Sequence, residues 1–563
     1  MSEMVYHHPK GAKCTAPGRL VTPQGGEVIV DRLIQEIWEY AGGRSLEEIY
    51  QANIARQYDP AASELDIALA LACLAEAGLL SRNNSDREGD EITRETPEAS
   101  NSARSEELVS TVIVSYNSQE WLPACLDSLQ KQSYRPLEVI VVDNGSMDGS
   151  ADWLKEAVKP GNATFARLGR TDEGRDVPER TVYLRAIYQD EPTSLSVAIN
   201  HGIRQARGKF YFLLNPDTRL EAQAIAALVS ALQEPEVQAP NAAAAAKLKL
   251  MWTPGFLNGL GNTVGAISWG MDIGLGHLDL GQFDDWRAVP SACFAAAMIP
   301  AAAWTAIGPL DENLPMYYED SEWCYRARLL GWQIAAAPQA VVYHALGGRI
   351  SNGQKPGNGR SSSANPAKQQ RVVYGRLHFI TRLLGPASWL RFMAGYFVED
   401  FVRWSLAALK RQANLRKSIC DAWRQYIRAF SQLRQENRQL REKRKQSDRQ
   451  FLKQQVMTKT PMAIPRPLVR QGVPQLTWEL VRSYYGPILI RQIQAGKTDH
   501  LLLTDKVLTD EVRELQWARS HLPPELLQAH KPGLMQRARI IYHLEGRGAL
   551  VERIAKTIQH ALR

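Results

Sequence analysis

Four short polar motifs follow one another between Thr111 and His344, and each lies where a strand should end. They read Val-Ser-Tyr-Asn (114–117), Val-Val-Asp-Asn-Gly-Ser (141–146), Leu-Leu-Asn-Pro-Asp-Thr (213–218) and Tyr-Tyr-Glu-Asp-Ser-Glu (317–322). A carboxylate at a strand end can accept a hydrogen bond from a nucleotide, hold a divalent cation, or remove a proton from a hydroxyl. An aromatic ring beside polar groups, as in the first motif, offers a face and an edge to a nucleotide base. Together the motifs favour a nucleotide-dependent reaction.

The segments between the motifs alternate between apolar runs and helical patterns. Runs that predict strands occupy Thr111–Val114, Leu137–Val142 and Phe210–Leu214. A helix is expected where Trp121, Cys125 and Leu129 share one face, and an alanine-rich helix from about Leu220. This alternation predicts an α/β domain whose parallel sheet carries helices on both faces and binds ligands at the carboxyl ends of its strands. The motifs lie at those ends.

The four motifs in this order resemble the family 2 glycosyltransferases, and among them the bacterial rhamnosyltransferase-like members. The resemblance covers about residues 110–345. It implies a GT-A fold over 107–345, a Rossmann-like mixed sheet with helices on both faces. It also implies inverting transfer of a sugar from a nucleotide-diphosphate donor, such as dTDP-rhamnose or a UDP-sugar, to an acceptor hydroxyl. Assembly of a cell-surface polysaccharide or glycan is the expected setting.

The resemblance assigns nucleotide-sugar contacts to several residues. They are Ser115, Tyr116, Asn117, Asp143, Asn200, Asn215 and Glu319. Residues 115–117 line the base and ribose pocket in the family, and Asn200 matches an asparagine on the helix beneath the nucleotide. A carboxylate at Asp143 suits a base N–H or a ribose hydroxyl. The alternative for Asp143 is a turn former, which Asp148 or Ser150 is expected to be as a helix N-cap. His201 is interpreted as a surface or packing residue.

The segment Asn215-Pro216-Asp217 corresponds to the Asp-x-Asp position of the family. A divalent cation, Mg²⁺ or Mn²⁺, held there would neutralise the departing phosphates. Asn replaces the first acid, so Asp217 is the one strong ligand. His344 ends an expected strand at the place where related enzymes use a histidine for the metal or diphosphate. The structural alternatives are a Pro-Asp turn for Asp217 and a packing histidine for His344.

The acidic pair Glu319-Asp320 precedes an expected helix. The family carries its catalytic base at this pair, and Asp320 matches it. The acceptor hydroxyl must lose its proton while it attacks the anomeric carbon, and a carboxylate within hydrogen-bond reach can take that proton. Glu322 is interpreted as a charge that favours the helix N-terminus.

Residues 1–81 predict a small separate domain. A turn and strand at 25–30 lead to a helix with Leu33, Ile37 and Tyr40 on one face, then a capping box from Ser45 to Glu48, then a third helix. This order resembles the PqqD-like winged-helix modules, which bind a peptide along a strand edge. A helical docking or packing domain is the alternative. Residues 82–106 are polar and charged, which predicts a flexible linker.

The C-terminal third has no motif that suggests chemistry. Residues 346–370 favour a loop or lid, 371–455 an amphipathic and basic helical region, and 456–563 a helical region of unknown role. Residues 411–450 contain 12 Lys/Arg and 4 Asp/Glu. The helical stretch therefore predicts either a contact with an anionic membrane or packing on the α/β domain followed by a solvated helix.

Composition excludes several classes of protein. The formal charge of +7 over 563 residues is mild, and no nucleic-acid partner is expected. Six cysteines without a Cys-x-x-Cys pair fit a reducing cytoplasm, with the inner membrane face as an expected peripheral site. The uncharged stretch 288–310 contains three prolines, so buried strand and turn are expected there. No phosphate-loop or dinucleotide pattern is present.

The acceptor is expected to be a glycan, a lipid-linked molecule or a peptide. Two further hypotheses remain: a peptide-recruiting glycosyltransferase that uses residues 1–81, and an inactive glycosyltransferase-like scaffold. The presence of Asp217 and Asp320 argues against the scaffold. Nucleotidyltransferases lack the late acidic pair and are ranked lower. A processive synthase is disfavoured because Asp400 stands where the Gln of Gln-x-x-Arg-Trp should be.

Overall fold

The computed structural model describes residues 5–83, 107–346 and 365–494, apart from gaps within these ranges, of which the longest are 159–165, 168–181 and 457–468. Nearly all of them form one compact unit, whereas residues 499–563 belong to a second unit outside the described part. Almost all of the linker expected at 82–106, and most of the loop expected at 346–370, lie outside the described residues.

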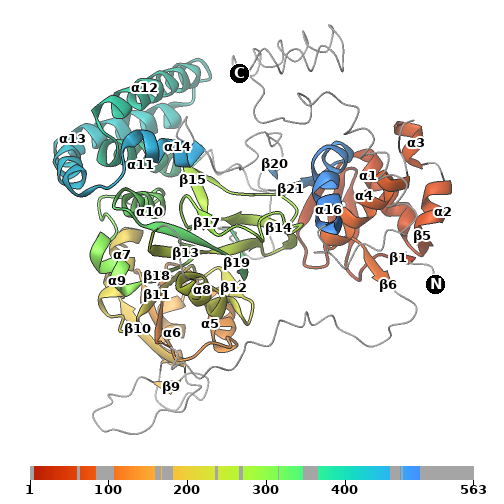
Figure 1. The fold of residues 1–563 in the computed structure, drawn as a ribbon, viewed down its shortest axis with the longest axis horizontal. Helices are drawn as coiled ribbons and strands as arrows, with labels where there is room; N and C mark the ends of the chain where they lie inside the picture. Colours follow the sequence, from red (N-terminus) through yellow and green to blue (C-terminus); the bar gives the residue numbers. More distant parts are fainter. Residues whose placement is uncertain are drawn as a thin grey trace. The chain divides into compact units, whose positions relative to one another are not determined.

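A mixed sheet of eleven strands forms the middle of the α/β domain (Figure 1). The strands are β7 (Val109–Ser115), β8 (Leu137–Asp143), β9 (Ala166–Arg167), β10 (Val182–Tyr188), β11 (Phe210–Leu214), β12 (Thr218–Leu220), β13 (Asn241–Leu250), β14 (Thr253–Leu260), β17 (Ala288–Val289), β18 (Ala296–Pro300) and β19 (Gln333–His344). Their order is β12-β19-β13-β18-β11-β7-β8-β10-β9, with β14 on β13 and β17 on β19. Strands β11, β7, β8 and β10 are parallel, while β18 runs antiparallel to β11 and β12 to β19. The mixed sheet expected from the family resemblance is confirmed.

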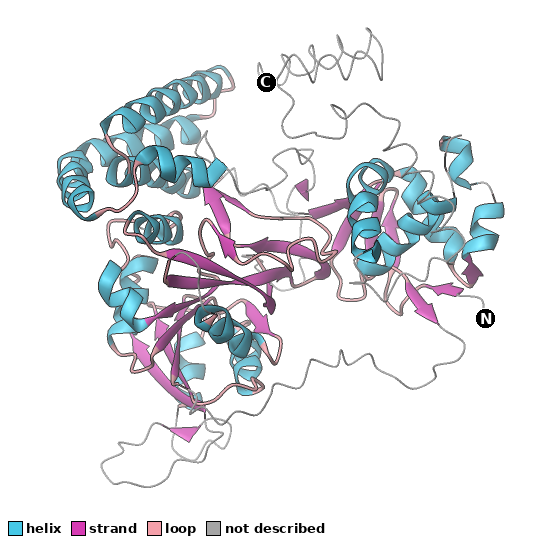
Figure 2. Cartoon of the chain, viewed as in Figure 1, coloured by secondary structure: helices cyan, strands magenta, loops and turns pink. Residues whose placement is uncertain are grey.

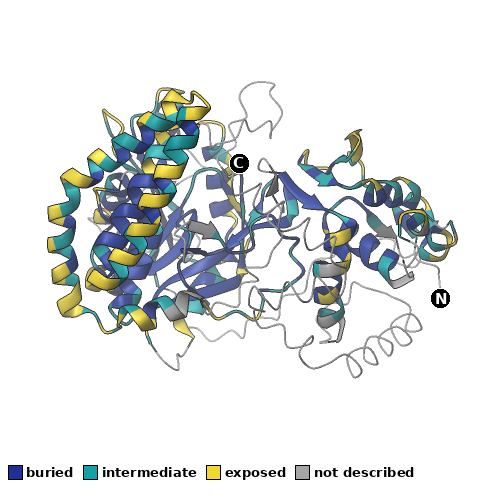
Figure 3. Ribbon diagram, turned by 90° about the horizontal axis from the view of Figure 1, so that it is seen from above, coloured by how far each residue is buried: buried dark blue, intermediate teal, exposed yellow. Residues whose placement is uncertain are grey.

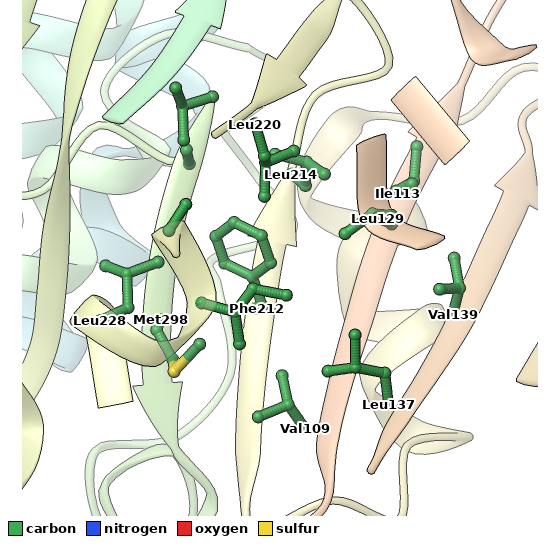
Figure 4. Close-up of a cluster of buried hydrophobic side chains, with 14 of the residues drawn as sticks. Val109, Ile113, Leu129, Leu137, Val139, Phe212, Leu214, Leu220, Leu228 and Met298 are labelled. Atoms are coloured by element: carbon green, nitrogen blue, oxygen red, sulfur yellow. The ribbon is translucent and has the colours of Figure 1, made fainter. Parts of the chain in front are cut away.

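Helices cover both faces of this sheet. One face carries α5 (Leu122–Gln130), α6 (Ser150–Ala157) and α8 (Ala224–Gln233), and the other carries α7 (Leu195–Arg204), α9 (Ala301–Ile307) and α10 (Glu319–Leu329). Successive side chains of a strand point to opposite faces. Val109 and Ile113 of β7 therefore join the first core, and Val112 joins the second. Figure 4 shows Phe212 inside the first core, and burial of such a side chain contributes about 1.5–3 kcal/mol.

Two segments of this domain, 288–310 and the alanine-rich helix, can be compared with the sequence expectations. The uncharged stretch 288–310 forms β17, β18 and α9, so the prediction of buried strand and turn is confirmed. The alanine-rich helix begins at Ala224 rather than near Leu220, because Thr218–Leu220 pairs with β19 as a strand. None of the described helices is long and apolar enough to cross a bilayer.

Four helices follow the α/β domain (Figure 2). They are α11 (Pro366–Leu383), α12 (Pro386–Leu409), α13 (Ala413–Lys443) and α14 (Asp448–Val456). The helical region thus starts earlier than the expected residue 371, because Asn365 caps α11 through the backbone N–H groups of Ala367 and Lys368. A third core joins α11 and α13 to Tyr325 and Leu329 of α10. The region therefore packs on the helix that carries the acidic pair.

The N-terminal module contains two small sheets and several helices. Its elements are β1 (Val5–His7), β2 (Lys13–Ala16), β3 (Arg19–Val21), β4 (Glu27–Val30), α1 (Arg32–Ala41), β5 (Arg44–Ser45), α2 (Leu46–Gln51), α3 (Ile54–Tyr58), α4 (Glu64–Glu76) and β6 (Ser81–Asn83). The expected capping box is present, because Ser45 accepts from the Glu48 N–H and Glu48 accepts from the Ser45 N–H. The PqqD-like role of this module stays a prediction.

The region after residue 456 is not simply helical, which corrects the expectation. Its described elements are β20 (Val469–Arg470), β21 (Val473–Leu476), α15 (Trp478–Leu480), a π-helix (Val481–Tyr485) and α16 (Gly486–Gln494). Strand β21 pairs in parallel with β4, so one sheet has the order β2-β3-β4-β21-β20. Trp478 donates its backbone N–H to Asp31 and its indole N–H to Asp59. The N-terminal module is therefore completed by residues more than 400 positions later.

Candidate active site

The first two motifs lie side by side because β7 and β8 pair in parallel. Ser115 is opposite Asp143 in this pairing, and the N–H of Asn144 donates to the Ser115 carbonyl at 2.8 Å. On the other side of β7, Leu214 of β11 lies opposite Ile113. The carboxyl ends of these parallel strands share one edge of the sheet. The first three motifs therefore meet at this edge.

Two buried oxygen atoms at this edge have no hydrogen-bond partner among the described residues. Asp143 is 2% exposed, and its Oδ2 accepts from the Ser146 N–H at 3.2 Å. Its Oδ1, and the Oγ of the buried Ser115, have no hydrogen-bond partner among the described residues. A buried unsatisfied polar atom costs about 1–3 kcal/mol, which a ligand donor would recover. Asp143 and Ser115 therefore suit the nucleotide contact that the sequence predicts.

Tyr116 and Asn117 differ in what they can offer a nucleotide. The ring of Tyr116 is 46% exposed, so it presents a free apolar face at the strand end. Asn117 has a left-handed backbone (φ 51°) and accepts from the Met147 N–H through its Oδ1 at 2.9 Å. Its own N–H donates to Ser146 Oγ at 3.0 Å. Asn117 thus holds the second motif in place, while Tyr116 is the candidate for stacking on a base.

Asn200 lies on α7 and is 2% exposed. Its Nδ2 donates to the Leu310 carbonyl and to Glu312 Oε1, both at 3.0 Å, and its Oδ1 accepts from the Leu310 N–H at 3.1 Å. Both the nitrogen and the oxygen of the Asn200 amide therefore form hydrogen bonds within the protein. This geometry gives Asn200 a role in positioning the loop before the fourth motif, and its direct contact with the nucleotide stays a prediction.

The third motif is joined to His344 through the sheet. Strand β12 pairs with β19 so that Thr218 lies opposite His344, and the Ala345 N–H donates to the Asp217 carbonyl at 3.0 Å. Asp217 Oδ1 then lies 3.3 Å from His344 Nε2, and these side chains are 15% and 8% exposed. Asn215 stabilises the turn that contains Asp217, because its carbonyl accepts from Thr218 Oγ1 at 2.6 Å.

A chain of amide contacts sets the tautomer of His344. Asn258 is buried on β14, and its Nδ2 faces Asp272 Oδ2 at 3.5 Å. Its Oδ1 is therefore turned to His344 Nδ1 at 2.7 Å, where a carbonyl oxygen can only accept. His344 Nδ1 then carries a hydrogen, and in the neutral ring this leaves a lone pair on Nε2 that faces Asp217. Such an outer hydrogen bond is the usual way in which a protein orients a histidine ligand.

The pair of Asp217 and His344 has the chemistry of a cation site. In the neutral tautomer, a carboxylate oxygen and an imidazole lone pair 3.3 Å apart are both acceptors, so either a cation or a proton on Nε2 must lie between them. Adjacent ligands of an octahedral cation with 2.1 Å bonds are about 3.0 Å apart. Within the described part of the chain, no three His, Cys, Asp or Glu side chains gather as a complete metal site. The protein thus offers two ligands that fit a divalent cation.

The fourth motif starts α10 and places Asp320 in its first turn. Asp320 Oδ2 accepts from Asn262 Nδ2 at 2.8 Å, and its Oδ1 accepts from the Ser321 N–H at 2.6 Å and from Ser321 Oγ at 3.2 Å. Tyr317 and Tyr318 before it have φ of 68° and 71°, a conformation that costs non-glycine residues about 1–3 kcal/mol. Strain of this kind, held beside an acidic pair, is typical of a functional site.

The two carboxylates of the pair are in different surroundings. Glu319 is 8% exposed, and its Oε2 has no hydrogen-bond partner among the described residues. Burial, and then the charge of Asp320, raise the pKa of Glu319. Burial also raises the pKa of Asp320, but the N–H and O–H donors around its carboxylate oppose this shift. We infer that Glu319 holds the proton and Asp320 the charge, which suits Asp320 as a base.

A small hairpin connects the cation end of the site to the base. Strands β15 (Asn262–Val264) and β16 (Gly270–Asp272) are antiparallel, and Asn262 lies opposite Asp272. Directly opposed side chains on such a pair point to the same face. Burial and then the charge of Asp320 raise the pKa of Asp272 to about 6. Asp217, His344, Asn258, Asp272, Asn262 and Asp320 therefore form one polar cluster, called the site cluster below.

A scan against protein families matches residues 110–244 to glycosyl transferase family 2. Residues 110–244 form a family 2 glycosyl transferase domain. The uncharacterized protein y4gI of Sinorhizobium fredii is 29% identical over 251 residues, which are 42% of this chain and 24% of the relative. The undecaprenyl-phosphate 4-deoxy-4-formamido-L-arabinose transferase of Serratia proteamaculans is 33% identical over 130 residues, 22% of this chain and 34% of the relative. The chain thus spans about a third or less of either relative.

Among solved structures, GalNAc-T7 with UDP, GalNAc and Mn²⁺ is similar to this chain with a TM-score of 0.42 and 14% identity, covering 62% of this chain and 57% of that one. A likeness at this level carries no weight in the assignment. The strand order and the family match identify the glycosyl transferase domain.

The structure of the α/β domain corrects two smaller expectations. Glu322 is fully buried and forms ion pairs with Arg326 at 3.0 Å and Arg382 at 3.4 Å, so it does more than favour the helix N-terminus. The N-cap of α6 is Gly149 rather than Asp148 or Ser150. Asp148 instead accepts from the Gln119 N–H at 3.0 Å, which ties the second motif to the first.

Sequence reasoning missed Asn258, Asn262 and Asp272 in the α/β domain. They lie on short strands in a glycine-rich stretch whose spacing gives no periodic signal. An asparagine at residue 258 and another at residue 262, on either side of two glycines, were the one available hint. Cys293 was missed too: burial and the charges of Asp272 and Asp320 raise the pKa of its thiol, so it faces the site cluster as a neutral group.

Proposed function

We propose that this chain is an inverting glycosyltransferase that moves a sugar from a nucleotide-diphosphate donor to an acceptor hydroxyl. The observation that carries the proposal is the site cluster, in which hydrogen bonds and ion pairs run from Asp217 to Asp272 and from Asn262 to Asp320, while Asp272 and Asn262 lie opposite each other on β16 and β15. One end of the cluster offers acceptors for a cation, and the other end offers a carboxylate for a proton. Transfer from a diphosphate to a hydroxyl needs both.

In the proposed reaction Asp320 accepts the proton of the acceptor hydroxyl. The hydroxyl oxygen forms a bond to the anomeric carbon while the bond from that carbon to the phosphate oxygen breaks. The electron pair of that bond leaves with the nucleoside diphosphate. Asn262 and Ser321 hold the Asp320 carboxylate in one orientation before the proton arrives. Asp143, Ser115 and Tyr116 supply the nucleotide contacts at the neighbouring strand ends.

Asp217 and His344 would hold a divalent cation, Mg²⁺ or Mn²⁺. When bound, such an ion stabilises the negative charge that develops on the leaving diphosphate. Asn258 and Asp272 keep the Nε2 lone pair of His344 facing that position. Asn215, in place of a second acid, contributes its backbone to the turn.

The donor is proposed to be dTDP-rhamnose or a UDP-sugar, and the setting to be cell-surface polysaccharide or glycan assembly. The acceptor is a glycan or a lipid-linked molecule. The similarity to the Serratia relative, an undecaprenyl-phosphate 4-deoxy-4-formamido-L-arabinose transferase, supports the lipid-linked choice. A peptide acceptor recruited by the N-terminal module is the second choice, although β21 occupies one edge of β4 in that module.

A donor screen tests the proposal. UDP-, GDP- and dTDP-sugars are compared by thermal shift with and without Mn²⁺, and a donor at 100 times its Kd should stabilise the protein by about 2.7 kcal/mol. The best donor is then assayed for hydrolysis with Asp320→Asn and with Asp152→Asn, an exposed control on α6. Transfer proceeding undiminished in Asp320→Asn, or no donor binding at all, would contradict the proposal.

A further inference from the structure

One face of α12 exposes a continuous apolar stripe. Leu390, Phe397 and Phe401 are 63%, 59% and 60% exposed, and Val398 and Val402 lie beside them. Their spacings of seven and four residues place them on one side of the helix. In Figure 3 the long helices of this region carry long yellow stretches, whereas the sheet is mostly blue. Monomeric proteins rarely leave such a stripe without a partner.

The acidic groups of α12 are turned away from this stripe. Glu399 and Asp400 both pair with the buried Arg376, the first at 2.9 Å. Asp400 also accepts from the indole of Trp423 on α13 at 2.9 Å. These are the two carboxylates of α12. The apolar stripe therefore carries no negative charge, although α12 itself contains two carboxylates.

An arginine-lined pocket lies at the first turn of α12. It has a volume of about 540 Å³ and includes Arg391 of α12, Arg441 of α13, Arg449 of α14, and Arg444 from the turn between α13 and α14. Arg444 is paired with Asp448 at 2.6 Å, and Asp448 also accepts from the Gly385 N–H at 2.9 Å. The other three arginines are exposed and form no ion pair within the described part of the chain.

The pocket and the stripe belong to the same face of α12. Arg391 precedes Val398 by seven positions and Val402 by eleven, which are the spacings of one helix face. The stripe then continues from Leu390 to the 80% exposed Leu409, a length of about 28 Å at 1.5 Å per residue. A ligand for this face must offer anionic groups at one end and hydrocarbon along the rest.

We propose that this face of α12 docks on an anionic membrane, with lipid phosphate groups in the arginine pocket and the apolar stripe among the acyl chains. Arginine binds phosphate oxygens through a fork of two N–H donors. A helix with an apolar stripe and a basic surround lies in the plane of a bilayer surface. The excess of 12 Lys/Arg over 4 Asp/Glu in residues 411–450 adds attraction for the same surface. A soluble phosphate would leave the stripe uncovered, so the lipid is the occupant. This proposal does not rest on the transferase activity.

Vesicle co-sedimentation of the full chain tests the proposal. The lipids are phosphatidylcholine alone and an equal mixture with phosphatidylglycerol, and binding is expected only to the mixture. Arg441→Gln with Arg449→Gln should lower the partition coefficient about 30-fold, because each arginine near such a surface contributes about 1 kcal/mol. Phe397→Ser with Phe401→Ser should lower it at least tenfold.

The matched control is Arg204→Gln with Arg207→Gln, two exposed arginines at the end of α7, outside both the pocket and the basic segment 411–450. It should change binding less than threefold. Equal loss in the control and the pocket variant, equal binding to both lipids, or no binding would each overturn the proposal. So would a dimer in analytical ultracentrifugation that Phe397→Ser with Phe401→Ser dissolves, or full occupation of the pocket by inorganic phosphate without vesicles. Unchanged thermal melting shows that the variants fold.

Discussion

Asn258→Leu should weaken cation binding without touching the cation site itself. The substitution removes the acceptor that lies 2.7 Å from His344 Nδ1. Without it, the imidazole can place its hydrogen on Nε2, pointing at Asp217 instead of offering a lone pair. Loss of such an outer hydrogen bond costs about 10- to 100-fold in metal affinity, which is about 1.4–2.8 kcal/mol. The side chain is 1% exposed and close to leucine in size, so the fold should survive.

Isothermal titration with Mn²⁺ in the presence of the bound donor measures this effect. The Kd for Mn²⁺ should rise 10- to 100-fold, and saturating Mn²⁺ should restore most of the turnover. Asn241→Leu is the matched control: Asn241 is also a buried asparagine, but its amide bonds to the Ala231 carbonyl at 3.3 Å. A Kd within twofold of the wild type, together with lost turnover, would refute the tautomer argument.

Four further outcomes follow from the contacts described. Asp320→Asn should lower turnover about 10²- to 10⁴-fold with donor affinity kept, as single-turnover assays with equilibrium binding would show. Folding raises the pKa of Glu319, so the folded state binds the proton more tightly than the unfolded state does, and the free energy of unfolding should fall as pH rises above about 4.5. Glu319→Gln should make the free energy of unfolding less dependent on pH, as measured by denaturant titration at several pH values. Phe212→Ala should cost about 3–5 kcal/mol of unfolding free energy, measured by urea titration. Asp311→Ala should cost about 3–5 kcal/mol, because it removes the carboxylate that pairs with the buried His378 and with Arg382, which keeps Glu322 and Glu436 as partners. Burial would raise the pKa of Asp311, but the hydrogen bond to His378 lowers it, so acid should erase this contribution as pH falls below about 3.8.

The strand ends of the site could be predicted because their signal is local. Val109–Ser115 and Leu137–Asp143 are short apolar runs closed by polar residues, and parallel pairing then brings Ser115 beside Asp143. The role of Asn200 could not be predicted, because its partners at residues 310–312 are over a hundred positions away. The local helix pattern says only that Asn200 is on a buried face.

The hairpin that joins the two ends of the site was beyond sequence reasoning for a different reason. Strand β14 shifts register against β13 twice, and Gly261 has a left-handed φ of 73°, where a Cβ would lie 2.3 Å from the Ser291 carbonyl oxygen. Such irregularities break the period of two on which strand prediction depends. Asp272 was therefore not recognised as a neighbour of Asp320.

The pairing of β21 with β4 has a practical consequence for any attempt to divide this polypeptide. A recombinant fragment that ends before residue 473 would leave the edge of β4 bare, and a fragment that starts after residue 83 would strip β21 of its neighbour. Bare strand edges recruit other chains and promote aggregation. The two ends have to be expressed together, or mixed so that the missing strand is supplied in trans.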